Sequence, residues 1–173
     1  VPTQILVQLC SEGVIERLAR GVYFPCGAEI SVNQTLQLLA LRCSNGVVCL
    51  LTALQFHKLT TQLSPETWIA IRQHKKIPKN LPVAVRVVAL NEASYCYGIE
   101  RHNVDGITLK IYSPAKTVAD CFKFRRKIGL DVALEALHDG WRQKRFTMAE
   151  LTKAAKACRV FNVMRPYMES LYE

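Results

Sequence analysis

The sequence lacks the short motifs that mark the well-known enzyme classes. Its 173 residues contain no H-E-x-x-H motif, no nucleophile elbow and no P-loop. The four histidines are scattered, and His102 and Asp105, which lie close together, bracket a predicted turn without a third metal ligand. We therefore expect this chain to have no catalytic site, to hold no metal and to need no cofactor.

One enzyme class stays open as an alternative. Glu100, Asp105 and Asp120 could in principle assemble a nuclease-like or nucleotidyl-transferring site, because convergent carboxylates bind the divalent metals of such enzymes. Nothing in the spacing of these three residues requires that arrangement.

The sequence also lacks long hydrophobic runs, a signal-peptide pattern and paired cysteines. Its longest apolar run, residues 46–54, is far shorter than the ~18 residues of a membrane-spanning helix. The seven cysteines are odd in number, show no C-x-x-C spacing and lie partly within apolar runs, which argues against a zinc ribbon or a disulfide framework. These absences predict a cytoplasmic protein with reduced, mostly buried thiols and no membrane partner. Because the chain begins with Val1-Pro2 and not with Met, we expect an upstream part to be missing.

Acidic residues are scarce, and the excess of basic over acidic residues is concentrated in parts of the chain. The chain has 23 Lys and Arg against 14 Asp and Glu, a net charge of +9, which favours a polyanionic partner, most often nucleic acid. Residues 1–30 are slightly acidic. The excess lies in three later places: Arg72 with Lys75, Lys76 and Lys79, residues 110–127, and residues 142–165.

The first residues predict a small DNA-binding unit. Residues 2–12 have helical periodicity, Gly13 suits the position after a helix end, and residues 14–24 form two β-prone runs around a turn with Gly21. Helix, glycine and a hairpin with arginine at its tip are typical of the end of a winged helix-turn-helix. We therefore predict a partial winged helix-turn-helix domain over residues 1–27 and a second domain over residues 28–173.

Five residues of this unit are candidates for DNA contact. Thr3, Gln4 and Gln8 share one side of the predicted helix, and such short polar side chains read base edges in the major groove. Arg17 and Arg20 lie in the hairpin, where they would contact phosphate. An ordinary surface helix and hairpin is the alternative interpretation.

The second domain is predicted to be mixed α/β, so the fold class is α/β (α+β), ending in a helical bundle. Helices are expected over residues 31–42, 52–57, 114–127, 130–141, from Thr147 onward, and over 160–172, bent or begun at Pro166; strands are expected over 47–50, 68–71, 83–90, 98–102 and 107–112.

The helix predicted over residues 114–127 carries a second candidate surface. Lys116, Asp120, Lys123 and Lys127 fall on one stripe, opposite the apolar one, which predicts a solvated face whose charge Asp120 partly neutralises. The run from Lys123 to Lys127 then places a dense cation cluster at the helix C-terminus, where it complements the helix dipole and could hold a phosphate. A solvated face without a partner is the alternative.

Several segments together resemble the AbiEi family of antitoxins from type IV toxin–antitoxin systems. The resemblance covers nearly the whole chain, and its most specific run is Ile111-Tyr112-Ser113-Pro114-Ala115-Lys116-Thr117-Val118-Ala119-Asp120-Cys121-Phe122. Further matches cover residues 13–23, 51–60, 68–71, 98–100, 104–106, 135–137 and 159–167, of which the match over residues 13–23 is generic by itself. The chain departs from the family pattern at its start, because it begins within the expected recognition helix and the two earlier helices are absent.

The resemblance implies a transcriptional autorepressor that binds operator DNA with inverted repeats and counters a nucleotidyltransferase toxin without a stable complex. It implies a C-terminal antitoxin domain whose basic surface would comprise Lys116, Lys123, Arg125, Arg126 and Lys127. A third hypothesis is a protein-interaction module that holds the toxin directly through an apolar face.

Overall fold

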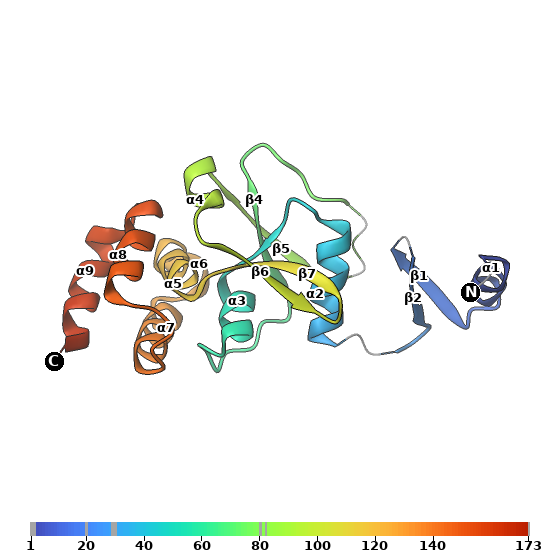
Figure 1. Ribbon diagram of the computed structural model, residues 1–173, viewed down its shortest axis with the longest axis horizontal. Helices are drawn as coiled ribbons and strands as arrows, with labels where there is room; N and C mark the ends of the chain where they lie inside the picture. Colours follow the sequence, from blue (N-terminus) through green and yellow to red (C-terminus); the bar gives the residue numbers. More distant parts are fainter. Residues whose placement is uncertain (1–2, 20, 29–30, 80, 82, 173) are drawn as a thin grey trace.

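The protein is a mixed α/β molecule with two separate sheets (Figure 1). The computed structural model describes residues 3–19, 21–28, 31–79, 81 and 83–172. None of the described helices has both the length and the apolar character needed to cross a lipid bilayer. The fold class predicted from the sequence, mixed α/β, is confirmed by the helices and the two sheets.

The N-terminal unit consists of one helix and one hairpin. Helix α1 spans Thr3–Ser11, and strands β1 (Ile15–Ala19) and β2 (Val22–Pro25) pair antiparallel. Gly13 follows the helix with a φ of 69°, and Gly21 lies in the hairpin turn with a φ of 78°, conformations that favour glycine. The predicted helix and hairpin are thus confirmed, and they lie at one end of the elongated molecule (Figure 1).

The larger sheet has five strands in the order β5-β4-β3-β7-β6. The strands are β3 (Val47–Val48), β4 (Thr67–Arg72), β5 (Val85–Leu90), β6 (Ile99–Val104) and β7 (Ile107–Tyr112). The pairs β3–β7 and β4–β5 are parallel, whereas β3–β4 and β6–β7 are antiparallel. The predicted β6–β7 hairpin is confirmed: Asp105 and Gly106 have φ values of 50° and 82°, both positive as in a tight type I′ turn.

Helices cover both faces of this sheet, because successive residues of its strands point alternately to apolar clusters on the two faces. On one face Val48, Ile69 and Ile111 pack near helix α2 (Val32–Arg42). Their neighbours Val47, Ala70 and Tyr112 point to the other face, where the largest core cluster lies. That cluster is covered by α3 (Leu50–His57), α5 (Pro114–Lys123), α7 (Leu130–Arg142), α8 (Met148–Ala157) and α9 (Phe161–Glu169).

Helix starts follow the local sequence. Ser31 and Thr147 each form a capping box, and the Ser113 hydroxyl accepts a hydrogen bond from the amide of Lys116 with Pro114 in the first turn.

Several predicted boundaries were wrong. The helix expected over residues 114–127 is interrupted at Phe124, so α5 ends at Lys123 and a short helix, α6, spans Arg125–Ile128. Short helix α4 (Glu92–Cys96) was not predicted, and α9 begins at Phe161 with Pro166 inside it, followed by the 3-10 turn η1 (Ser170–Tyr172). The division between residues 27 and 28 stays a prediction.

Candidate nucleic-acid interface

Helix α1 presents the predicted base-reading residues to solvent. Thr3, Gln4 and Gln8 are exposed, and the helix buries none of its residues. The Gln8 side-chain amide donates a hydrogen bond of 2.8 Å to a carboxylate oxygen of Glu12. The polar side of α1 is therefore accessible over its length, with one acidic neighbour at its end.

The hairpin carries Arg17 on an exposed position of β1. Arg17 lies opposite Tyr23 in the strand register, and its guanidinium carbon lies 5.9 Å from the centre of the Tyr23 ring. This stacking orients a cation on the hairpin surface. Arg20, the other predicted phosphate contact, lies outside the described residues.

The hairpin is joined to the body through α2. Leu18 is buried, and its carbonyl accepts a 2.8 Å hydrogen bond from Nη1 of Arg42, near the end of α2. This contact places β1 beside the C-terminal end of α2.

The prediction that Lys116 belongs to a basic surface is wrong. Lys116 is 0% exposed, and its ammonium group lies 2.6 Å from Asp120, which is also buried. Its Nζ also lies 4.5 Å from the centre of the Tyr112 ring. The part of the predicted solvated stripe formed by Lys116 and Asp120 is instead enclosed, because α5 packs against α3, α7 and α8, and pairing at i and i+4 allows both charges to be buried.

Asp120 has further partners in this enclosed site. The thiol of Cys158 donates to Asp120 Oδ1 at 3.3 Å. Burial raises the pKa of Asp120 above its ordinary value, and the Lys116 ammonium opposes that shift. The pair is part of the core and is closed to solvent.

The other four predicted cations remain near the surface around the break between α5 and α6. Lys123 is half-buried and donates a 3.4 Å hydrogen bond to Ser94, while Nη1 of Arg125 donates to the carbonyl of Phe122 at 2.8 Å. Arg126 and Lys127 are exposed. These two cations are therefore the most accessible members of the predicted surface.

The most specific sequence run serves packing. The carbonyl of Tyr112 accepts hydrogen bonds from Nε2 of His57 at 2.7 Å and from the Thr117 hydroxyl at 3.2 Å. The Tyr112 hydroxyl donates in turn to the carbonyl of Tyr95 at 2.8 Å. Gly98, with a φ of +73°, lies against Lys116, where a Cβ atom would be 2.7 Å from the lysine Cβ. These contacts assign the polar residues of the run to the core.

The three carboxylates of the enzyme alternative are not assembled into one site. Glu100 contacts His102 on β6 at 3.1 Å, and Asp105 accepts from Gln37 at the hairpin turn, whereas Asp120 is buried on α5. In the part of the chain that the structure describes, no three His, Cys, Asp or Glu residues form a group that could hold a metal ion.

A further basic segment, outside the predicted site residues, lies in the loop that follows β4. Lys75, Lys76 and Lys79 are exposed in the loop between β4 and β5, on the α2 side of the sheet. Three lysines within five residues without an acid between them were the signal that could have identified it.

No protein-family model matches this sequence, and no curated protein matches it.

Proposed function

We propose that this chain is a DNA-binding transcriptional autorepressor and antitoxin, without catalytic activity of its own, that acts in the cytoplasm and counters a nucleotidyltransferase toxin. The operator would contain inverted repeats, and the toxin would be countered without a stable complex. The family resemblance of the sequence supports this role.

One structural observation carries the DNA-binding part of the proposal. Helix α1 and its hairpin extend from the body of the molecule, and α1 exposes Thr3, Gln4 and Gln8 along its length (Figure 1). A helix with an exposed polar side and an adjoining hairpin that carries an arginine has the dimensions and chemistry that suit a major groove and its flanking phosphates. Arg17 is the described cation of this hairpin.

A binding assay tests this part. Duplexes covering the region upstream of the gene should compete better than random duplexes of equal length for binding to the chain. The double variant Gln4→Ala/Gln8→Ala should lose about 1–3 kcal/mol of discrimination for each base contact removed. The matched control Gln62→Ala/Gln73→Ala changes two exposed glutamines outside α1 and should bind as the unmodified chain does. Equal affinity for upstream and random duplexes would contradict the proposal.

Co-expression tests the antitoxin part. The chain should restore growth to cells that express the nucleotidyltransferase encoded beside it, and affinity purification should recover no toxin. If the chain does not restore growth, the antitoxin role is contradicted. Stable co-purification of the toxin with the chain would favour a direct protein-interaction module.

A further inference from the structure

We propose that a second phosphate-binding surface, formed by Lys75, Lys76 and Lys79 with Arg42, extends the DNA contact of the hairpin onto the body of the protein. We call this set the loop surface. The inference rests on the proposed function for its choice of partner, the sugar-phosphate backbone of duplex DNA. It differs from the predicted basic surface around Arg126 and Lys127, which lies with α5 and α6 on the other side of the sheet.

The lysines of the loop surface carry uncompensated charge. All three are exposed, and within the described ranges the salt bridges of Lys and Arg with carboxylates involve other residues. The neighbouring Arg72, by contrast, pairs with Glu92 at 3.1 Å. Uncompensated cations close together attract a polyanion more strongly than the same number of ion-paired ones.

The loop is held in place by an apolar anchor. Ile77 and Leu81 pack against a cluster of Leu39, Cys43 and Ile69, which joins α2 to the sheet. Because Ile77 lies between Lys76 and Lys79, this packing fixes the backbone that carries the lysines. A fixed cationic loop loses less conformational entropy on binding than a free one.

A hollow of about 270 Å³ connects this loop with the end of α2. Its lining includes Arg42, Asn45 and Lys76, and none of its described lining residues is acidic. Lys110 adds a further cation at this edge, because its ammonium group donates a 2.8 Å hydrogen bond to the carbonyl of Ser44. A phosphate group placed here would lie among cationic and amide side chains.

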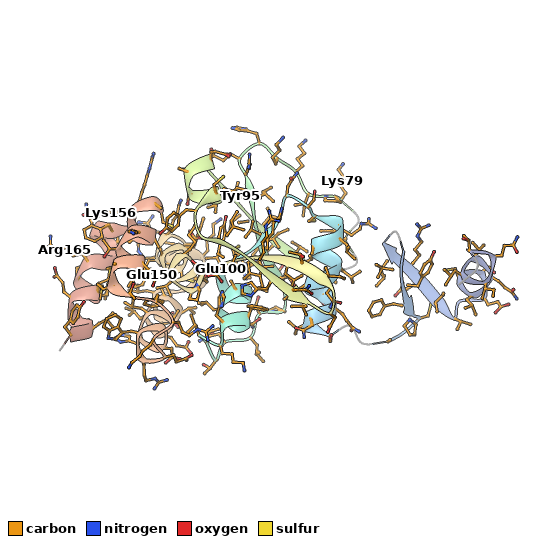
Figure 2. All side chains as sticks on the ribbon, in the orientation of Figure 1. Lys79, Tyr95, Glu100, Glu150, Lys156 and Arg165 are labelled. Carbon is orange, nitrogen blue, oxygen red and sulfur yellow. The ribbon has the colours of Figure 1, made fainter. Side chains whose placement is uncertain are left out.

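The same arginine links the hollow to the hairpin. Arg42 lines the hollow and donates to the carbonyl of Leu18 in β1. The hairpin, Arg42 and the loop surface therefore follow one another on the α2 side of the sheet, and Lys79 points away from the body beside α2 (Figure 2). This continuity favours duplex DNA as the partner, because its backbone can run on from the hairpin to the loop surface. An acidic protein partner would need no hairpin.

Salt-dependent binding tests the loop surface. A labelled 30-base-pair duplex of random sequence is titrated with the full chain between 50 and 300 mM NaCl by fluorescence anisotropy. The triple variant Lys75→Glu/Lys76→Glu/Lys79→Glu should bind at least tenfold more weakly. If the three lysines contact three phosphates, the slope of log K against log salt should flatten by about 2.7, which is three times 0.9.

A control variant with the same change in net charge separates position from total charge. Lys144→Glu/Lys153→Glu/Lys156→Glu alters three exposed lysines at the helical end of the molecule, where Lys156 is labelled in Figure 2. This variant should change affinity less than threefold, and circular dichroism should show that both triple variants are folded. Equal effects of the two triple variants, or an unchanged slope in the first, overturn the inference.

The two proposals fail in different ways. The loop variant should weaken binding to upstream and random duplexes alike, whereas Gln4→Ala/Gln8→Ala should weaken only the preference for the upstream sequence. A flattened slope without any sequence preference would refute the proposed regulator and leave the loop surface standing. If the loop variant keeps the slope of log K against log salt but no longer binds an acidic protein partner, the three lysines serve that partner. This result would overturn the inference.

Discussion

Helices α1 and α5 both carry polar residues along one side, yet they have opposite environments. Helix α1 buries none of its residues, whereas α5 buries eight of its ten, including Lys116 and Asp120. A polar stripe on a helix therefore does not by itself identify a surface. Where the helix packs on several sides, as α5 does, the polar residues become partners of one another, and only on a helix such as α1 are they available to a ligand.

The largest expected effect comes from breaking the buried pair of α5. Lys116→Met should reduce the free energy of unfolding by about 3–5 kcal/mol, because it leaves the Asp120 carboxylate buried without its counter-charge. Urea unfolding followed by circular dichroism measures the loss. The double variant Lys116→Met/Asp120→Leu should recover most of the stability, since two apolar side chains need no pairing. A loss below 1 kcal/mol in the single variant would contradict the buried-pair interpretation.

A smaller loss of stability should follow from crowding the buried pair of Lys116 and Asp120. Gly98→Ala should destabilise the protein by roughly 1–3 kcal/mol, because alanine disfavours a φ of +73° and its Cβ would meet Lys116. The matched control is Gly106→Ala, which has a φ of +82° but no atom near its added Cβ. Thermal unfolding should show a greater loss at Gly98; equal losses would mean that backbone strain alone acts there.

His57 should make the core sensitive to acid. Burial lowers the pKa of His57 from its ordinary 6.5 in the folded protein, so between the two pKa values the unfolded chain binds more protons. Stability should therefore fall as the pH is lowered through 6.5. His57→Phe should lose about 1 kcal/mol at pH 8, from the hydrogen bond to Tyr112, and should show a shallower decline in acid.

Unfolding midpoints in urea between pH 5 and pH 8 measure this dependence. His74→Phe, at an exposed histidine, is the control and should keep the decline of the unmodified chain. An equally steep decline in His57→Phe would assign the acid sensitivity to other groups.

The smallest effect on stability is expected in α1. Gln4→Ala/Gln8→Ala should change the free energy of unfolding by less than about 0.5 kcal/mol, because both side chains are exposed. The same variant is the one expected to reduce operator discrimination. A loss of stability comparable to that of Gly98→Ala would show that α1 is a structural element and would remove the contrast with α5.

Much of the local structure could be predicted from the sequence, because it depends on neighbouring residues. Ser31, Ser113 and Thr147 begin helices through side-chain hydrogen bonds to amides three residues later. The Asp105-Gly106 pair likewise sets the β6–β7 hairpin through its own positive φ angles. Helix α4 begins with a cap of the same kind, since the Asn91 side chain accepts from the amide of Ser94, whereas Phe124 at the break offers no side-chain cap.

The candidate sites could be predicted only in part. The exposure of Thr3, Gln4 and Gln8 agrees with the sequence pattern, whereas Lys116 was assigned to a surface that it does not reach. Helical periodicity gives the side of a helix on which a residue lies, but it does not tell which sides are covered by distant segments. That information came from the packing of α7 and α8 on α5.

The sequence by itself determined the excess of positive charge, the helix caps, the hairpin turns and the order of elements, since these depend on composition and on residues a few positions apart. Only the tertiary structure decided which cations are available to a partner. It enclosed Lys116 with Asp120, and it brought Arg42 beside both the hairpin and Lys76. The physical reason is that the cost of burying a charge depends on what surrounds it, and those surroundings come from segments far apart in the chain.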